Sequence, residues 1–213
     1  MFQIKDFTFN PMQENTYILY NEFKECIIID PGCYDHSEKK ELQTFIKDNY
    51  LEPKFLLNTH CHLDHIFGNR FIAEEYTLKL HTHKLEEGIL QMAATQGLMF
   101  NLPFDNYAGE IIHLQEGEEI SLREDKLEII FVPGHSPGSI CFYCAKQNFI
   151  IGGDVLFKDS IGRTDLPGGS HQGLLKNIQE KLFILPDNVI VYPGHGPKTT
   201  IGQEKKTNPF FIL

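Results

Sequence analysis

The sequence has no long apolar run. Its longest apolar stretches, such as CIII and NFIIG, are far shorter than the roughly 20 residues that a membrane-spanning helix needs. The first ten residues, MFQIKDFTFN, contain no apolar core of about 7–15 residues, which a secretory leader would have. We therefore expect no membrane association, no export and a cytoplasmic location.

Clustered cations are also absent. The 29 acidic residues outnumber the 19 basic ones, giving a net charge of -10, and the Lys and Arg residues are scattered along the chain. Binding to a phosphate backbone requires gathered cations. We therefore expect no nucleic-acid partner, which also argues against an RNA-processing phosphodiesterase.

Cysteines are few and odd in number, which disfavours a disulfide framework. The five are Cys26, Cys33, Cys61, Cys141 and Cys144. Without a leader, reduced thiols in the cytosol fit this set best. Cys141 and Cys144 form a C-x-x-C pattern, but they lie in a predicted strand, where positions three apart face opposite sides of the sheet. We predict that both are packing residues.

No linker-like run of Ser, Pro or Gly divides the 213 residues. With 41% hydrophobic and 23% charged residues, the composition is that of a folded globular protein. A chain of this length can build one substantial core and is short for two independent ones. We predict a single domain over residues 1–213.

Short β-rich runs alternate with longer amphipathic runs, which indicates an α/β domain. The predicted strands are 16–21, 26–30, 55–59, 128–132, 139–144, 148–153 and 189–193. The predicted helices are 36–49, 66–76, 83–95 and 172–183. The first helix should begin after Asp35, because Glu38 three residues later completes a capping box.

Several predicted strands are followed by a His or an Asp. FLLNTH ends at His60, IIFVPGH at His135, FIIGGD at Asp154 and VIVYPGH at His195, and IIIDPG contains Asp30 in a similar place. In layered α/β sheets, sites collect at the carboxyl ends of strands. These side chains are therefore expected to converge on one sheet edge.

The segment HCHLDH concentrates metal-ligand residue types. In an extended chain, His60 and His62 point the same way, and a turn into a helix can bring Asp64 and His65 to the same place. Gly68 leaves room for close backbone approach. Imidazole and carboxylate are the usual ligands of Zn²⁺ and other first-row ions, so we predict a metal site.

Seven residues are candidate ligands: His60, His62, Asp64, His65, His135, Asp154 and His195. One tetrahedral zinc with an open position uses fewer. The number suits two divalent ions about 3.5–4 Å apart, with one carboxylate bridging them. Zinc is the preferred ion, with iron and manganese as alternatives. The remaining histidines are expected in capping or surface roles: His36, His81, His83, His113 and His171.

The motifs THCHLDH, PGHSPGS, GGD and PGHGP resemble the metallo-β-lactamase fold superfamily in order and spacing along nearly the whole chain. The segments NPMQENTYIL, GGDVLF, IGRTDLPGG and GHGPKTTIGQEKKTNPF are most similar to the short glyoxalase II-like hydrolases, relatives of hydroxyacylglutathione hydrolase. The resemblance implies a four-layer αβ/βα sandwich with metals in a groove at its edge.

The resemblance also implies a division of the ligands. His60, His62 and His135 would hold the first metal, Asp64, His65 and His195 the second, and Asp154 would bridge them. Asp64 and Asp154 are the predicted catalytic residues. Asp30 is a candidate for orienting a ligand His, although capping its own turn is an equally good interpretation.

Two divalent ions against two aspartates leave such a site positive, so a bridging water loses a proton near neutral pH. The hydroxide attacks an acyl carbon and the metals stabilise the oxyanion. We prefer a thioester substrate, because a thiolate whose conjugate acid has a pKa of about 8.5 leaves without a general acid. The expected substrate is a small acyl compound such as an S-2-hydroxyacylglutathione.

Other interpretations stay open. The site could hydrolyse a lactone or β-lactam, or it could hold one iron and oxidise persulfides as some relatives of the superfamily do. A non-catalytic scaffold is disfavoured because no ligand is missing. Full-length glyoxalase II enzymes carry an additional C-terminal helical domain for which this sequence has no room, so substrate contacts could come from residues 95–107 or from Arg163. For these side chains, core packing and a surface ion pair with Asp165 are the alternatives. The sequence does not indicate the oligomeric state.

Overall fold

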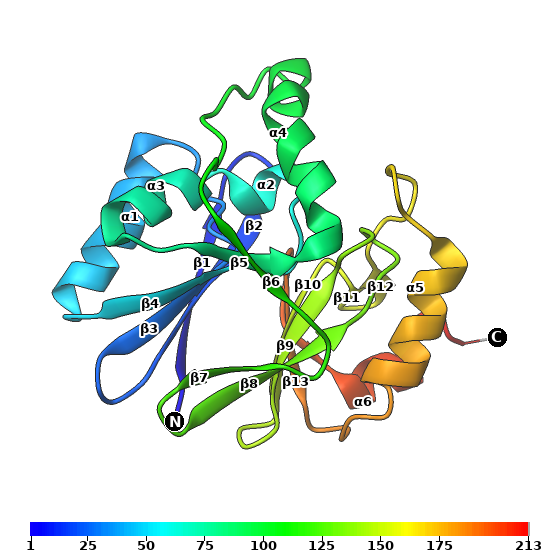
Figure 1. Cartoon of the computed structure of the whole chain (residues 1–213). Coiled ribbons are helices and arrows are strands. Elements are labelled where there is room, and N and C mark those ends of the chain that lie inside the picture. Colours follow the sequence, from blue (N-terminus) through cyan, green and yellow to red (C-terminus); the bar gives the residue numbers. More distant parts are fainter. Residues whose placement is uncertain (213) are drawn as a thin grey trace. The chain divides into compact units, whose positions relative to one another are not determined.

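A computed structural model describes residues 1–212, and these fold as two compact units. Unit 1 comprises Met1–His113 and Leu122–Asp125, and unit 2 comprises Leu114–Ser121 and, of the described residues, 126–212. Each unit contains one six-stranded mixed sheet (Figure 1). The single domain over residues 1–213 stays a prediction.

The sheet of unit 1 follows the chain order from β1 to β6. Its strands are β1 (Gln3–Phe9), β2 (Glu14–Tyr20), β3 (Glu25–Ile29), β4 (Glu52–Leu57), β5 (Leu80–His83) and β6 (Ile111–Leu114). β1, β2 and β3 pair antiparallel, whereas β3, β4 and β5 pair parallel. The carboxyl ends of β3 and β4 therefore lie at the same edge of the sheet.

Helices cover one face of this sheet (Figure 1). They are α1 (His36–Asp48), α2 (Leu63–Ile66), α3 (Asn69–Tyr76) and α4 (Glu87–Met99), with a 3-10 turn at Lys84–Glu86. Ile18, Ile28 and Leu56 from alternate strand positions pack against Leu42 of α1 and Ile72 of α3. This alternation is the two-residue period of a strand meeting the apolar side of amphipathic helices.

The sheet of unit 2 has the order β14-β13-β10-β9-β8-β7. Its strands are β7 (Glu119–Leu122), β8 (Asp125–Phe131), β9 (Ile140–Cys144), β10 (Phe149–Gly153), β13 (Ile190–Pro193) and β14 (Thr199–Thr200). A small hairpin forms from β11 (Leu156–Phe157) and β12 (Ser160–Ile161). β9 is antiparallel to both β8 and β10, and β13 is parallel to β10, so β8, β10 and β13 end at the same edge.

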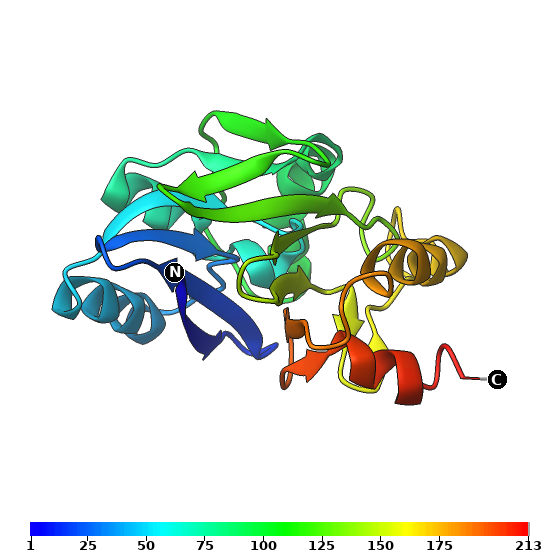
Figure 2. The ribbon, with the colours of Figure 1, turned by 90° about the horizontal axis from the view of Figure 1, so that it is seen from below.

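The helices of unit 2 are α5 (His171–Asn177), which continues as one π-helical stretch over Ile178–Leu182, and α6 (Ile201–Thr207). Figure 2 shows α5 and α6 beside the strands of this unit. Leu174 of α5 and Ile201 of α6 share one buried cluster with Cys141, Ile150 and Val191 of the sheet. The core of unit 2 therefore lies between its sheet and these helices.

All seven predicted strands are present, and Asp35 caps α1 with the predicted capping box to Glu38. The predicted helix over 66–76 is wrong as one element, because it is divided into α2 and α3 around Phe67 and Gly68. The predicted helix over 83–95 begins as a 3-10 turn and becomes α-helical only at Glu87.

Cys141 and Cys144 are buried in β9, and within residues 1–212 none of the five cysteines forms a disulfide. The packing interpretation of this pair is confirmed. Burial raises the pKa of the Cys26 and Cys33 thiols to about 12 each. Within residues 1–212, no helix has the length and apolar character required to cross a membrane.

Candidate metal centre

The first group of candidate ligands follows two parallel strands of unit 1. Asp30 comes directly after β3, and the segment from His60 to His65 follows β4. This segment is a loop that enters the short helix α2, which carries Asp64 and His65. Cys61 and Leu63 alternate with the candidate ligands and are buried.

Three imidazoles of this loop face one another. The ring centroid of His60 lies 4.8 Å from that of His62 and 4.1 Å from that of His65. Oδ2 of Asp64 lies 3.8 Å from Nε2 of His65. His60 and His65 are 1% and 0% exposed, so they are nitrogen donors in a site with little solvent. We refer to His60, His62, Asp64 and His65 as the unit 1 ligand set.

Asp30 contacts both Thr59 and His65 of this loop. Its Oδ1 accepts a hydrogen bond of 2.7 Å from the backbone N–H of Thr59, and its Oδ2 accepts one of 2.6 Å from the Thr59 hydroxyl. The same Oδ2 lies 3.1 Å from Nδ1 of His65. A carboxylate on one ring nitrogen fixes the tautomer and leaves the other nitrogen to a metal. The contact with His65 is the one that the orienting role considered from the sequence requires.

Two asparagines that the sequence analysis did not single out brace the loop. Asn58 donates to Oδ1 of Asp30 at 3.2 Å and to the backbone oxygen of His65 at 3.0 Å. Asn69 donates to Oδ1 of Asn58 at 2.6 Å. All of these side chains are buried. The available signal was that Asn58 stands between an apolar strand and the first ligand.

Gly68 allows the backbone after α2 to approach the loop after β3. Its N–H donates to the backbone oxygen of Pro31 at 2.7 Å. A Cβ at this position would lie 2.5 Å from Sγ of Cys33, a distance that real Cβ contacts do not show. The predicted close approach is confirmed, and it explains why the helix breaks here.

The second group of candidate ligands lies in unit 2. His135 follows β8, Asp154 follows β10 and His195 follows β13, at the edge where these three strands end. Nε2 of His135 and Nε2 of His195 each lie 3.6 Å from Oδ2 of Asp154. We refer to these three residues as the unit 2 ligand set.

His135 is oriented by a backbone group. Its Nδ1 lies 2.8 Å from the carbonyl oxygen of Arg163, which leaves Nε2 on the side of Asp154. The Arg163 guanidinium itself forms two hydrogen bonds with Asp165, of 2.8 and 2.7 Å. The surface ion pair considered from the sequence is thus present, and it lowers the pKa of the Asp165 carboxyl to about 2.

The residues of both sets fit divalent metal ions. A separation of 3.6 Å is too long for a hydrogen bond. It is close to the distance between two ligands of one ion when each metal–ligand bond is about 2.0–2.2 Å. In unit 1, atoms of Asp30, His60 and His65 lie within 4.8 Å of one another. Imidazole and carboxylate are the donors that zinc, iron and manganese use.

Three of the remaining histidines, His81, His83 and His113, have structural contacts. Nδ1 of His83 accepts from the N–H of Leu85 at 3.3 Å and caps the turn before α4. His81 lies 3.0 Å from the backbone oxygen of Lys79 and packs edge-on against Phe55. His113 contacts Glu87.

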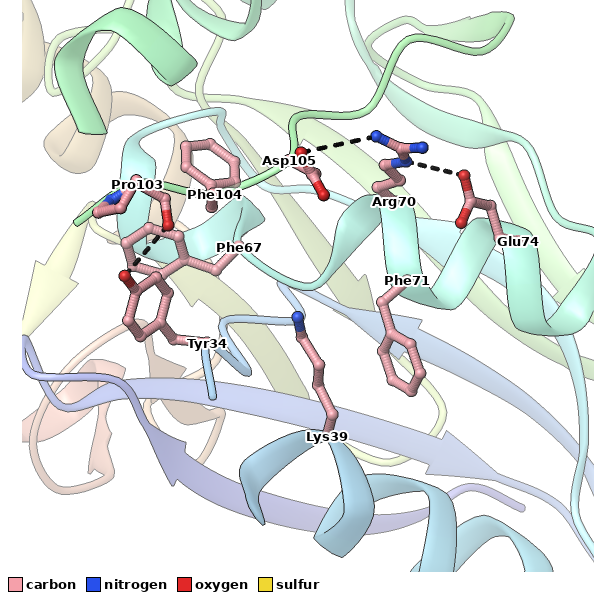
Figure 3. Close-up of a pocket in the computed structure, with 9 residues that line it drawn as sticks. All are labelled: Tyr34, Lys39, Phe67, Arg70, Phe71, Glu74, Pro103, Phe104 and Asp105. Carbon is pink, nitrogen blue, oxygen red and sulfur yellow. Dashed lines mark hydrogen bonds and ion pairs between the residues drawn. The ribbon is translucent and has the colours of Figure 1, made fainter. Parts of the chain in front are cut away.

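The segment 95–107 contributes to a pocket of about 400 Å³ in unit 1 (Figure 3). The pocket is lined by Tyr34, Lys39, Phe67, Arg70, Phe71, Glu74, Pro103, Phe104 and Asp105. Phe104 packs edge-on against Phe67, with ring centroids 5.0 Å apart, and the Tyr34 hydroxyl donates to the Pro103 carbonyl at 3.1 Å. Met99 and Phe100 are exposed.

Two cations reach this pocket (Figure 3). Nε of Arg70 lies 2.8 Å from a Glu74 carboxylate oxygen, and Nη1 lies 3.8 Å from Asp105. The Lys39 ammonium lies 5.8 Å from the centre of the Phe71 ring and, within residues 1–212, forms no ion pair. Lys39 is therefore available to an anionic group.

Comparison with known proteins places these observations in a family. The profile of the metallo-beta-lactamase superfamily matches residues 9–195. The chain is 38% identical over 201 residues to the probable metallo-hydrolase YqgX of Bacillus subtilis, covering 94% of this chain and 93% of that one. It is 36% identical over 200 residues to the hydroxyacylglutathione hydrolase GloC of Haemophilus influenzae, covering 93% and 92%.

Solved structures agree with these matches. The crystal structure of the BLEG-1 B3 metallo-beta-lactamase superposes with a TM-score of 0.90 at 37% identity, covering 99% of this chain and all of that one. The crystal structure of TTHA1623 in a di-iron-bound form superposes with a TM-score of 0.87 at 32% identity, covering 97% and 99%.

Proposed function

The chain belongs to the metallo-β-lactamase superfamily and has its α/β fold, and we propose that it is a dinuclear-metal thioesterase acting on S-2-hydroxyacylglutathione-type substrates. Membership supports the coarser assignment of a metal-dependent hydrolase. The observation that carries the finer proposal is the pair of imidazole–carboxylate sets, one at a strand edge of each unit.

In this proposal the unit 1 and unit 2 sets together hold two divalent ions. His60, His62 and His135 bind one ion, Asp64, His65 and His195 bind the other, and Asp154 serves both. The contact of Asp154 Oδ2 with two imidazoles supports its shared role. Zinc suits the donor set, and iron does too, as the di-iron form of a relative at 32% identity illustrates.

When bound, two such ions lower the pKa of a water molecule and stabilise the negative charge that develops on the acyl oxygen. The protein's own residues fix the donors. Asp30 and the Arg163 carbonyl hold Nδ1 of His65 and His135, so both imidazoles present Nε2. The buried positions of His60 and His65 keep bulk water away from the donors.

A thioester is favoured over an amide because a thiolate leaves without receiving a proton from the protein. The relative named hydroxyacylglutathione hydrolase covers nearly the whole chain and supports the same substrate class. We propose that Lys39 and the aromatic side chains of the unit 1 pocket receive the anionic, peptide-like part of such a substrate.

The test is hydrolysis of S-lactoylglutathione by zinc-loaded protein, followed as loss of the thioester absorbance. Chelator-sensitive turnover supports the proposal. If folded protein with two bound metals shows no turnover, the substrate assignment is wrong and the metal site remains.

Hydrolysis of a β-lactam is a second candidate, favoured by the similarity to a B3 metallo-beta-lactamase over the whole chain. A chromogenic cephalosporin assayed under the same conditions separates the two activities. Elemental analysis and oxygen consumption with a persulfide test the mononuclear-iron oxidation alternative. Elemental analysis showing one iron per chain, together with uptake of oxygen, would replace both hydrolase proposals.

A further inference from the structure

Glu14 is a fully buried acid that no part of the proposed chemistry uses. It begins β2 and is 0% exposed. Its Oε2 accepts a hydrogen bond of 2.9 Å from the Thr16 hydroxyl. Its Oε1 has no hydrogen-bond partner among residues 1–212, and this oxygen lies 3.8 Å from Nδ1 of His65.

A carboxyl group in this environment is unfavourable for folding. Glu14 is 0% exposed, so water does not solvate its carboxyl group. A buried polar atom without a hydrogen bond costs free energy relative to the unfolded chain, in which water satisfies it. Stability therefore does not account for an acid at this position, and such local conflicts concentrate at functional sites.

The surroundings of Glu14 are built to hold it. The Thr16 hydroxyl also lies 2.8 Å from the Asp30 carbonyl oxygen and accepts from the Gly32 N–H at 2.9 Å. A Cβ at Gly32 would lie 2.1 Å from Oε2 of Glu14, so only glycine leaves space for this carboxyl group. The loop after β3 that contains Asp30 and Gly32, called the Asp30 loop below, therefore restricts the position of the Glu14 carboxyl group, and the carboxyl group restricts the loop.

The same arrangement extends to Asp64. Nδ2 of Asn10 donates to the Gly32 carbonyl at 3.0 Å and to the Asp64 carbonyl at 2.9 Å. The loop packed against Glu14 is thus tied to the backbone of one candidate ligand. Through Asp30, the loop also reaches the imidazole of another, His65.

We propose that Glu14 is a positioning residue for His65, and that it strengthens the binding of the ion held by Asp64 and His65. This inference rests on the proposed function. Asp30 and Glu14 place two carboxyl groups on the Nδ1 side of the imidazole, at 3.1 and 3.8 Å. They restrain the ring so that Nε2 stays on the side of Asp64, 3.8 Å from its Oδ2.

The test compares the full-length wild type with Glu14→Gln, which keeps the shape and removes the acid. Zn²⁺ is titrated into each metal-free protein in competition with a chelator, and bound zinc is counted by elemental analysis. We expect the weaker zinc affinity to fall about 10- to 100-fold in the variant, the usual effect of losing a group that orients a ligand. The urea midpoint of the metal-free variant should equal or exceed that of the wild type, because the buried acid is gone.

Glu204→Gln is the matched control. Glu204 is also buried, but its oxygens accept from the Asp159 N–H, the Thr199 hydroxyl and the Asn208 amide. This variant should lose stability and keep both zinc affinities. A positioning residue affects zinc affinity without a loss of stability, whereas a packing residue affects stability without a loss of zinc affinity.

The inference is overturned if Glu14→Gln binds zinc as the wild type does, or if it loses stability while both affinities are kept. Should Glu14→Gln not fold, Glu14→Asp retains the carboxyl group and withdraws it from His65. Wild-type zinc affinities in that variant would overturn the inference equally. A wild type that binds fewer than two zinc ions contradicts the proposed function instead.

Discussion

Nδ1 of His65 lies 3.1 Å from Oδ2 of Asp30, and both side chains are buried. Asp30 has a positive φ of 49°, a conformation that Asp and Asn adopt more readily than other non-glycine residues. Because Asn tolerates this backbone, Asp30→Asn changes the charge with little added strain. We predict an affinity loss of about 10- to 100-fold for the ion at His65, measured by chelator competition.

Thr59→Val provides a comparison for this prediction. It removes the hydroxyl that donates to Asp30 and leaves the carboxylate facing His65. We expect a smaller loss of affinity than in Asp30→Asn. Equal zinc affinity in Asp30→Asn and the wild type would show that Asp30 only caps its turn.

Asp154 should be essential for turnover and dispensable for folding. Its Oδ2 faces both His135 and His195, and replacing it with Ala removes the shared carboxylate. We predict that kcat for thioester hydrolysis falls at least about 10²- to 10³-fold, the effect of losing one preorganised electrostatic group. Far-UV circular dichroism should be unchanged, and Asp165→Ala, at an exposed ion pair, should retain activity. Full activity of Asp154→Ala would show that turnover does not need the shared carboxylate and would contradict the proposed role of Asp154.

Removing the metal should lower thermal stability reversibly. An ion that binds only the folded state adds about 2.7 kcal/mol when its free concentration is 100 times its Kd. For a chain of this size, about 1 kcal/mol changes Tm by about 2–4 °C, so the expected shift is roughly 5–10 °C. Calorimetry with excess chelator, followed by added Zn²⁺, measures the loss and the recovery. A Tm independent of metal would mean that the ligand sets hold no ion.

Most of the candidate site residues were predicted because they directly follow predicted strands. Apolar runs ending in His or Asp correctly predicted that Asp30, His60, His135, Asp154 and His195 follow strands. The expectation of a single sheet edge is wrong, because β3 and β4 belong to one sheet and β8, β10 and β13 to another. The reason is local: buried strands are continuous apolar segments, and a polar residue directly after one marks its end.

Residues that depend on distant contacts were not predictable. Glu14 stands in the polar segment QENT, which looks like a turn, yet it is buried because the Asp30 loop folds over it. The break at Gly68 arises because its N–H bonds to Pro31, 37 positions earlier. The strands β1 and β5 lack a clear apolar run, so their place in the sheet depends on contacts with neighbouring strands.

Acid should destabilise the fold partly through His81. Its pKa is lowered below 6.5, chiefly by burial, so the folded state binds fewer protons than the unfolded state. The stabilisation is fully present above pH 6.5 and is lost as pH falls toward the folded pKa. We predict that His81→Asn loses less stability than the wild type between pH 7.5 and 5.5, measured by urea unfolding of metal-free protein.

His83 offers an internal check on this prediction. Burial lowers the pKa of His83 as well. The stability of the double variant His81→Asn/His83→Asn should therefore depend on pH even less than that of His81→Asn. If the stability of the wild type and of His81→Asn changed equally with pH, His81 would have the same pKa in the folded and unfolded states.

Lys39 should contribute to substrate binding and little to the chemical step. Its ammonium lies in the unit 1 pocket beside Phe71 and forms no ion pair within residues 1–212. A partly exposed charge pair contributes up to about 1 kcal/mol, so Lys39→Gln should raise KM for S-lactoylglutathione up to about fivefold with kcat unchanged.

Lys40→Gln is the matched control for Lys39→Gln, because Lys40 is exposed on the same helix and does not line the pocket. Its KM should equal that of the wild type. Added salt should reduce the difference in KM between Lys39→Gln and the wild type, because dissolved ions screen an exposed charge pair. A KM that Lys39→Gln leaves unchanged at low salt would place the anionic part of the substrate elsewhere, whereas a fall in kcat alone would assign Lys39 to the reacting atoms.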